Sequence, residues 1–259
     1  MPLLQSEEGL FTKSSRMKYI LGIPAAIFVV LGIVVIIINI IPDATNPGIT
    51  LHPSQVVISY NSSHKHNEYI TELDKFIEAY ETPPANSITC NDTTTLGPEE
   101  SCWFEDKWLG GVCVKNKWGY VNIANNTSPC ILVTPNKVVG WVPETYSTKE
   151  ELPNEMPQYL KNVIINDWHD RGSIYKWVWV SCEVVSGDGE CSMTPWQGFP
   201  DYYFPYNDNT NYRSPILAPR INWRGTEKKR IEMRFQLWAK NINPSDTTVT
   251  IVIEADQPK

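Results

Sequence analysis

The longest hydrophobic stretch of the chain lies near its N-terminus. Residues 19–41 read YILGIPAAIFVVLGIVVIIINII and contain no charged side chain. A helix of about 20 apolar residues is long enough to cross the hydrocarbon core of a bilayer. A cleaved signal peptide would instead have an apolar region of about 7–15 residues, followed by a small-residue cleavage site. The pattern therefore predicts a transmembrane helix over residues 19–41 that stays part of the chain.

Basic residues beside this stretch indicate its orientation. Lys13, Arg16 and Lys18 precede it, and no lysine or arginine follows it before Lys65. Cytoplasmic flanks of membrane helices carry an excess of such residues, so we expect residues 1–18 in the cytoplasm and everything after residue 41 outside. Small residues in the span would allow close approach of a partner helix, although they are also common in membrane helices generally. These small residues are Gly22, Ala25, Ala26 and Gly32.

Two repeating patterns of apolar residues follow the span, one at helical spacing and one at strand spacing. Apolar residues recur at helical spacing over residues 67–80, before Pro83 and Pro84, which predicts one helix. Elsewhere the period is two, which is typical of strands. We expect strands at residues 130–134, 176–182, 231–237 and 249–253. Such strands, separated by clusters of turn residues, favour an antiparallel, immunoglobulin-like β-sandwich with one flanking helix over residues 66–259, after an extended stalk at residues 42–65.

The cysteines agree with this topology, because all six lie on the outer side: Cys90, Cys102, Cys113, Cys130, Cys182 and Cys191. An even number of cysteines in an oxidising compartment indicates a disulfide framework. Zinc is the alternative, but it would favour cysteine pairs spaced by two to four residues, and the chain has none. Spacing alone leaves the disulfide connectivity open.

Glycosylation sequons fall on the same side of the expected membrane span. Four asparagines match the acceptor pattern, all in polar, turn-like stretches: Asn61, Asn91, Asn125 and Asn126. Because Asn125 and Asn126 are adjacent, we expect a glycan on only one of them. The sequons thus support an extracytoplasmic domain.

Charge and motifs argue against several classes of function. The formal net charge of the 259 residues is −7, so the basic stripe of a nucleic-acid-binding protein is absent. His64 and His66 could bind a metal, but no further ligand lies nearby in sequence, which favours a solvated segment. Residues 167–172, DWHDRG, are more typical of a polar turn between strands than of a catalytic site. The chain also lacks a nucleophile elbow, a phosphate-binding glycine loop and an HExxH motif. We therefore expect no catalytic residue, no metal site and no cofactor.

Local motifs suggest a family. Residues 102–113, CWFEDKWLGGVC, form the most specific motif, and they are accompanied by residues 69–80 (YITELDKFIEAY), 119–120 (GY), 129–131 (PCI), 136–140 (NKVVG), 202–206 (YYFPY), 215–218 (PILA) and 241–242 (NI). In this order, after a short basic tail and one span, they resemble the β subunits of the Na,K-ATPase and H,K-ATPase cation pumps. The likeness covers nearly the whole chain, with one extra residue before the second cysteine of the 102–113 motif.

The resemblance implies two disulfide bridges by position: Cys90–Cys102 and Cys113–Cys130. For the third bridge, the family joins a cysteine matching Cys182 to one in a late Ile-Glu-Cys strand. Here residues 231–239 read IEMRFQLWA, so Met233 or Phe235 takes the place of that cysteine, depending on the register. Because Cys191 follows Cys182 closely, we expect a local Cys182–Cys191 bridge instead.

The resemblance also implies a non-catalytic role at the plasma membrane. Such β subunits pair with the catalytic α subunit of a P-type ATPase, help it fold and reach the cell surface, and tune its binding of external potassium. A small single-span regulatory subunit would be a further partner, besides membrane lipid. Tyr19 joins the small residues of the span as a candidate contact with an α-subunit helix. The extracellular contact candidates are aromatic and could equally be core: Tyr202, Tyr203, Phe204 and Tyr206.

Two alternatives belong to other functional classes. A type II adhesion or receptor-like protein could have the same architecture, since a sandwich fold does not by itself name a function. A type II glycosyltransferase would favour a metal-binding Asp-x-Asp motif, and the chain contains none.

Overall fold

The computed structural model describes residues 46–61, 68–110, 113–120, 128–171, 176–224 and 229–256. The chain divides into two compact units, Met1–Ala44 and Thr45–Lys259, and every described residue belongs to the second unit. Within the described ranges, no helix has the length and apolar character needed to span a membrane. The expected span at residues 19–41, with its candidate helix contacts, lies outside the described residues.

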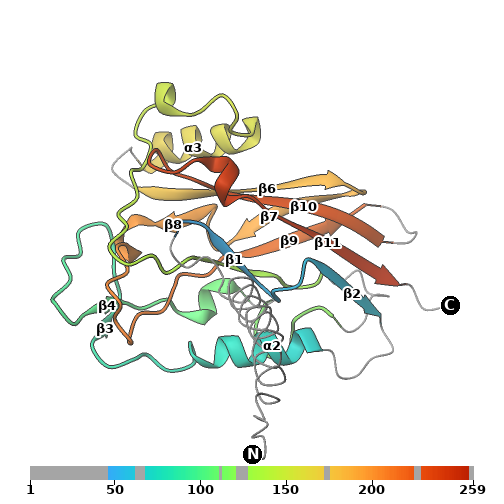
Figure 1. Ribbon diagram of the computed structural model, residues 1–259, viewed down its shortest axis with the longest axis horizontal. Coiled ribbons are helices and arrows are strands. Elements are labelled where there is room, and N and C mark those ends of the chain that lie inside the picture. The colour runs from blue at the N-terminus through green and yellow to red at the C-terminus, as the bar shows by residue number, and fades with distance from the viewer. Residues whose placement is uncertain are drawn as a thin grey trace, which may run out of the picture. The chain divides into compact units, whose positions relative to one another are not determined.

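A five-stranded sheet forms the centre of the second unit (Figure 1). Its strands, in spatial order, are β2 (Val57–Asn61), β11 (Val249–Asp256), β10 (Lys229–Trp238), β6 (Trp177–Ser186) and β8 (Gly198–Pro200). The three strands expected over residues 176–253 are confirmed as β6, β10 and β11. β2 pairs with β11 in parallel, whereas the other neighbours are antiparallel. The β2–β11 pair therefore departs from the expected antiparallel arrangement.

Three two-stranded ladders surround the central sheet. They pair β1 (Ile49–His52) with β5 (Leu132–Pro135), β3 (Ser87–Ile88) with β4 (Ser101–Cys102), and β7 (Gly189–Thr194) with β9 (Ala218–Trp223). Because β1 and β2 come from residues expected to form a stalk, the folded domain starts earlier than the expected boundary at residue 66. One sheet with three small ladders does not confirm the immunoglobulin-like sandwich, and the coarser description, a mainly-β domain with few helices, holds.

In the parts of the chain that the structure describes, two α-helices cover this β-structure, where one was expected. The expected helix is confirmed as α2 (Glu68–Glu78), which buries Tyr69, Leu73 and Ile77. The second, α3 (Gln158–Arg171), includes most of the 167–172 stretch, so the expectation of a turn between strands there is wrong. Short 3₁₀ helices complete the described elements: Asp106–Leu109, Lys149–Glu151, Asp201–Tyr203 and Pro244–Thr247.

The central sheet is buried on both faces. Residues directly paired across β6 and β10 point to the same face. Val180 and Leu237 form such a pair and contribute to the larger hydrophobic cluster, which also contains the buried side chains of α2. Trp179 and Trp238 form the next pair and point to the opposite face. There they join a second cluster beneath α3: Tyr146, Leu152, Met156, Leu160, Ile164, Trp177, Trp179 and Trp238. The alternation expected for residues 231–237 is thereby confirmed.

The connection from β6 to β7 depends on a glycine. Gly187 has a φ of 101°, a conformation that residues with a Cβ rarely adopt. A Cβ at this position would also lie 2.3 Å from the carbonyl oxygen of Arg230 in the adjacent strand β10. The tight approach allows the chain to leave the central sheet directly after β6.

Candidate partner-binding surface

The aromatic residues of the 202–206 motif do not share one environment. Tyr203 is only 2% exposed, and its hydroxyl donates a hydrogen bond to the carbonyl oxygen of Trp103 at 3.2 Å. Tyr202, Phe204 and Tyr206 are half-buried and keep part of their rings at the surface. Tyr203 thus belongs to the hydrophobic core, while contact of its three neighbours with a partner stays a prediction.

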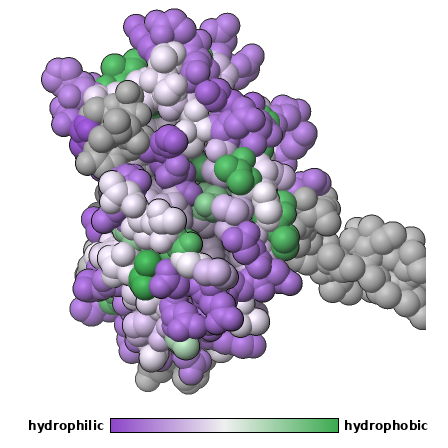
Figure 2. All heavy atoms as spheres, turned by 90° about the vertical axis from the view of Figure 1, so that its left-hand side faces the viewer, coloured by the Kyte–Doolittle hydropathy of each residue, from purple (hydrophilic) through white to green (hydrophobic). Residues whose placement is uncertain are grey.

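An apolar loop lies at the surface beside this motif. Residues 138–142 read VVGWV, and the side chains of Val139 and Val142 are 64% and 58% exposed. The face shown in Figure 2 is mostly hydrophilic, with only a few hydrophobic side chains among polar ones. Sequence reasoning did not place these valines on a contact surface, because an apolar run is normally assigned to the core.

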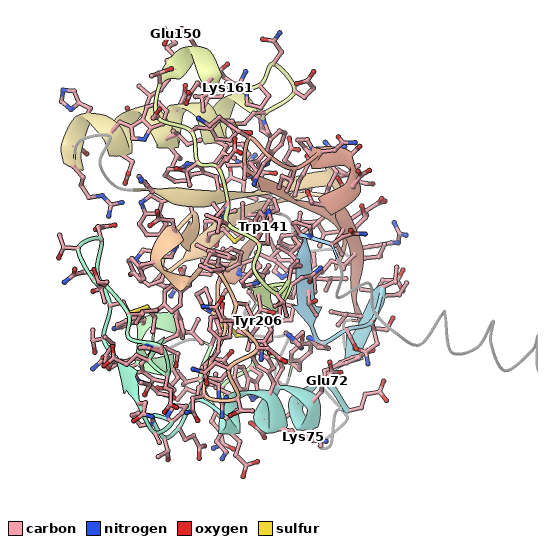
Figure 3. The ribbon with its side chains drawn as sticks, turned by 60° about the vertical axis from the view of Figure 1, so that its left-hand side comes forward. Glu72, Lys75, Trp141, Glu150, Lys161 and Tyr206 are labelled. Carbon is pink, nitrogen blue, oxygen red and sulfur yellow. A yellow bond between two sulfur atoms is a disulfide. The ribbon has the colours of Figure 1, made fainter. Side chains whose placement is uncertain are left out.

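Contacts with the 202–206 motif hold this loop in place. The N–H of Gly140 donates to the carbonyl oxygen of Tyr206 at 2.9 Å. The ring of Trp141 meets that of Phe204 edge-on, with centroids 5.3 Å apart. Figure 3 shows Trp141 and Tyr206 near one another on the same side of the domain. The loop therefore lies directly beside Phe204 and Tyr206.

The side chain of Asn241 forms hydrogen bonds with the backbone at the end of the loop. Its side-chain nitrogen donates to the carbonyl oxygen of Val142 at 2.8 Å, and its side-chain oxygen accepts from the N–H of Glu144 at 3.0 Å. A single exposed amide thus binds two backbone groups of an irregular segment. The Asn-Ile motif gave only a family resemblance, and its structural role emerges from these two contacts.

Two cations lie at the edge of the surface. The amino group of Lys137 lies 5.6 Å from the ring centroid of Tyr206 and 5.7 Å from that of Tyr212. Burial, with a smaller effect of nearby Arg213, lowers the pKa of Lys137. Arg213 donates hydrogen bonds to the backbone oxygens of Ala79, Thr210 and Tyr212. In the described parts of the chain, neither cation forms an ion pair with a carboxylate.

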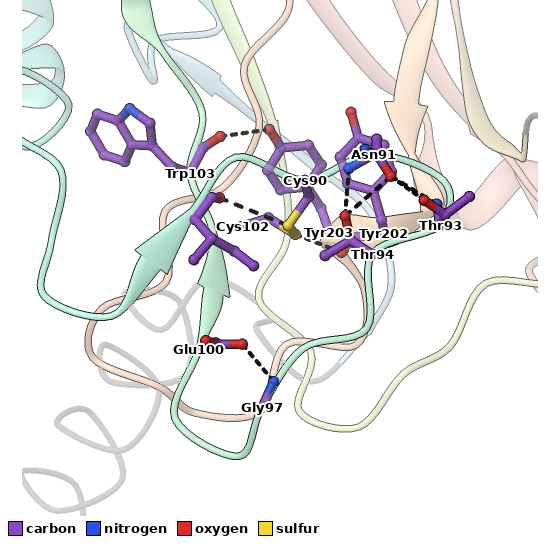
Figure 4. The surroundings of a disulfide bond; sticks show 11 residues. Cys90, Asn91, Thr93, Thr94, Gly97, Glu100, Cys102, Trp103, Tyr202 and Tyr203 are labelled. Carbon is purple, nitrogen blue, oxygen red and sulfur yellow. Dashed lines mark hydrogen bonds between the residues drawn. A yellow bond between two sulfur atoms is a disulfide. The ribbon is translucent and has the colours of Figure 1, made fainter.

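The six cysteines form three disulfide bridges: Cys90–Cys102, Cys113–Cys130 and Cys182–Cys191. The first two are those that the resemblance implies, and the third is the local bridge expected in place of the family's third one. The Cys90–Cys102 bridge lies beside the 202–206 motif, with Cys102 Sγ 3.1 Å from the carbonyl oxygen of Tyr202 (Figure 4). The register places Phe235 of β10 directly opposite Cys182, while Met233 lies opposite Val184. A fully buried phenylalanine therefore faces Cys182 where a cysteine could have bridged the two strands.

The sequons are described only in part. Asn91 is exposed, and its side-chain oxygen accepts hydrogen bonds from the N–H (2.9 Å) and hydroxyl (2.8 Å) of Thr93 (Figure 4). Asn125, Asn126 and the side chain of Asn61 lie outside the described residues. Glycan attachment at all four positions stays a prediction.

The polar residues of the 167–172 stretch contact one another on the surface of α3. Arg171 pairs with Asp167 one turn earlier on α3, and His169 lies 3.1 Å from Asp170 at the exposed end of the helix. The i,i+4 spacing of Asp167 and Arg171 is typical of ion pairs on helix surfaces. Within the described ranges, no group of three His, Cys, Asp or Glu side chains could hold a metal ion. His64 and His66 lie outside these ranges.

Comparisons with known proteins agree with the motifs. The family described as sodium/potassium ATPase beta chain matches residues 38–253. Among curated proteins, the chain is 29% identical to sodium/potassium-transporting ATPase subunit beta-1 of Drosophila melanogaster and 28% identical to subunit beta-2 of the same species. These matches cover 78% and 76% of this chain and 66% of each relative, so the chain spans slightly less than two thirds of their length. A probable beta-3 subunit of Caenorhabditis briggsae is 23% identical over 78% of this chain and 60% of its own length. Because the family match covers well over half of the residues, the chain belongs to the sodium/potassium ATPase β chain family.

Proposed function

We propose that this protein is the non-catalytic β subunit of a P-type sodium/potassium or proton/potassium pump. The family match over residues 38–253 is the observation that carries the proposal. In this role the chain assists folding of the catalytic α subunit, its delivery to the plasma membrane and its binding of external potassium. The α subunit hydrolyses ATP and moves the ions.

The proposed topology gives each segment a task. Residues 19–41 cross the membrane once and dock on an α-subunit helix through Tyr19 and the small residues of the span. The second compact unit, with its three disulfide bridges and glycans at the sequons, lies outside the cell. Oxidising conditions outside the cytoplasm favour such bridges. Treatment with a glycosidase should shift the electrophoretic mobility of the chain, and N91Q should reduce that shift if Asn91 carries a glycan.

Co-expression with an α subunit tests the proposed function directly. The tagged full chain is expressed with a sodium/potassium pump α subunit in cells depleted of their own β subunits. An unrelated type II glycoprotein serves as the control. We expect the chain, but not the control, to co-purify with the α subunit in mild detergent and to raise the amount of α subunit labelled at the cell surface. Recovery of the chain alone would overturn the proposal and favour an adhesion or receptor-like protein.

Potassium activation provides a second readout. If the chain tunes potassium binding, the potassium dependence of ATPase activity should differ between complexes of one α subunit with this chain and with another β subunit. Identical activation curves would remove this part of the proposal, while co-purification would still support the pump-subunit role.

A further inference from the structure

His52, at the end of β1, is packed mostly against uncharged groups. Its ring stacks on that of Phe76 in α2, with centroids 4.0 Å apart, and its Nε2 lies 3.5 Å from the hydroxyl of Thr134 in β5. Its partner across the β1–β5 ladder, Leu132, is fully buried. The charged group that faces His52 is Glu72, one turn before Phe76 on α2. Protonation of His52 would therefore place a positive charge in an apolar contact, with one carboxylate nearby.

Glu72 holds the segment that follows His52 against α2. The Glu72 carboxylate accepts a hydrogen bond from the N–H of Ser54 at 2.9 Å and another from the side-chain nitrogen of Gln55 at 3.3 Å. Glu72 lies on the side of α2 that faces β1 and β2 (Figure 3). Because residues 53–55 lead from β1 to β2, these two hydrogen bonds fix the connection between the strands.

Gln55 is satisfied only in part by this arrangement. Its side-chain oxygen is buried and, within the described ranges, has no hydrogen-bond partner. A buried acceptor without a donor costs free energy, and water would supply the donor if residues 53–55 moved away from α2. The next residue, Val56, is already 69% exposed. The free energy needed to release this segment is therefore lower than for a segment with every polar group bonded.

We propose that His52 and Glu72 form an acid-sensitive latch between α2 and the β1–β2 connection. At neutral pH, Glu72 binds Ser54 and Gln55, and residues 53–55 stay on α2. In acid, His52 takes up a proton from solvent, the imidazolium pairs with the Glu72 carboxylate, and residues 53–55 leave α2. The proton returns to solvent when the pH rises, so the change is reversible. This latch goes beyond the pump-subunit role and does not depend on it.

Proton linkage gives the direction of the change. Burial lowers the pKa of His52, so the latched state disfavours the charged ring. The released ring is solvated and paired with Glu72, and it binds a proton more readily. The latch is thus closed above the ordinary pKa of 6.5 and opens as the pH falls below that value. Because one proton is bound, the ratio of released to latched chains changes by at most about tenfold per pH unit. Histidine switches of this kind respond to the acidity of endosomes.

Amide hydrogen exchange at Ser54 tests the latch, because this N–H donates to Glu72. Exchange is measured on the full chain in detergent at about pH 7.5 and about pH 5.5, and each rate is divided by the intrinsic rate at that pH. We expect protection of the peptide that contains Ser54 to fall by about tenfold in acid, while β10 keeps its protection. Unchanged protection at Ser54, or an equal fall in β10, would overturn the inference.

Substitution of His52 identifies the titrating group. H52F keeps an aromatic ring against Phe76 but cannot bind a proton, so protection at Ser54 should be the same at both pH values. H169F is the matched control, because His169 is exposed at the end of α3 and should leave the acid response intact. A fall in H52F as large as in the original chain would show that another group titrates, and the latch would be wrong.

Substitution of Glu72 tests the other half of the latch, also in the event that H52F does not fold. E72Q replaces a charged acceptor with a weaker, neutral one. Protection at Ser54 should therefore already be low at about pH 7.5 and should change little on acidification. E78Q, at an exposed position of the same helix, is the control and should behave like the original chain. Full protection of E72Q at about pH 7.5 would show that Glu72 does not hold the segment and would overturn the inference.

Discussion

The two faces of the central sheet are covered in different ways. On one face, the larger cluster includes five of the six cysteines, and Cys191 packs against it, so every disulfide bridge belongs to this side. On the other face, the cluster beneath α3 contains three tryptophans and no cysteine. Covalent bridges thus reinforce one layer, whereas the other depends on packing and a few polar contacts.

Polar contacts at the edge of the α3 layer are correspondingly important. Glu151 accepts hydrogen bonds from the backbone N–H of Ser147 (2.7 Å) and from the amino group of Lys240 (3.0 Å). These bonds lower the pKa of Glu151 to about 2. The contact with Lys240 links the segment before α3 to the residues that follow β10. Because only one face carries disulfide bridges, we expect the α3 layer to open more readily than the bridged layer.

Phe235→Ala should have the largest effect on stability. Phe235 is fully buried in the larger cluster, so its truncation leaves a cavity and should cost about 3–5 kcal/mol of unfolding free energy. Denaturant unfolding of the full chain in detergent, followed by tryptophan fluorescence, measures this change. Gln236→Ala, at the neighbouring position on the opposite face, should cost far less. Equal losses would contradict the assignment of the two faces.

Leu160→Ala tests the unbridged face. Leu160 is fully buried beneath α3, and its truncation should cost about 2–5 kcal/mol. We expect faster amide hydrogen exchange in α3, with little change in β10, because the layer can open locally. Asn166→Ala, at an exposed position of the same helix, is the control and should leave exchange nearly unchanged. Equal acceleration in α3 and β10 would show that the layers unfold together.

Removal of disulfide bridges tests the covalent side. By loop-closure entropy, loss of Cys113–Cys130 should cost about 3 kcal/mol and loss of Cys182–Cys191 about 2.5 kcal/mol, since they span 17 and 9 residues. Paired serine substitutions and unfolding measurements give both values. Hydrogen exchange in α3 should change little in either variant. A larger loss for the shorter bridge would indicate that loop-closure entropy does not dominate its contribution.

Tyr159→Phe removes a polar contact between α3 and the sheet. The Tyr159 hydroxyl accepts a hydrogen bond from the N–H of Cys182 (2.6 Å) and donates one to its carbonyl oxygen (3.0 Å). Losing both should cost about 1–2 kcal/mol, measured by denaturant unfolding. Tyr206→Phe removes a hydroxyl that bonds only to exposed Asp208 among described residues and should cost less. Similar small losses in both variants would argue against a special role of Tyr159.

Acidification should have the smallest effect, acting through His52 on the bridged side. His52 of β1 stacks on Phe76 of α2, with ring centroids 4.0 Å apart, and Thr134 lies 3.5 Å from its Nε2. Burial lowers the pKa of His52, partly opposed by the charge of Glu72. The unfolded chain then binds a proton more readily, so this contribution to stability is present above pH 6.5 and is lost as pH falls below that value. Unfolding measured against pH should show this loss, and His52→Phe should reduce it.

Much of the central sheet was predictable because its strands carry a local pattern. Ile231, Met233 and Phe235 alternate with polar residues, and all three are fully buried. Helix α3 was missed although Leu160, Ile164 and Trp168 recur at helical spacing, because Asn162 and Asn166 have low helix propensity. The pairing of β2 with β11 was also missed, since the two strands lie nearly two hundred residues apart in the sequence.

The exposure of the 202–206 motif and of the loop beside it was predictable only in part. The sequence pattern could not separate buried Tyr203 from half-buried Tyr202. The apolar run at residues 138–142 resembles core sequence, and its exposure depends on hydrogen bonds to Tyr206 and Asn241. Tyr206 and Asn241 lie far from the loop in the sequence, so no local pattern of residues indicates these hydrogen bonds.

By itself, the sequence determined the features that depend on neighbouring residues. These include the apolar run at residues 19–41, helix α2 and the alternating faces of β10. Tertiary structure alone decided the second face of the sheet beneath α3, the folding of β1 and β2 into the domain, and the exposure of Val139 and Val142. The physical reason is that burial depends on which distant segments pack together, whereas periodicity records only that a side chain is apolar.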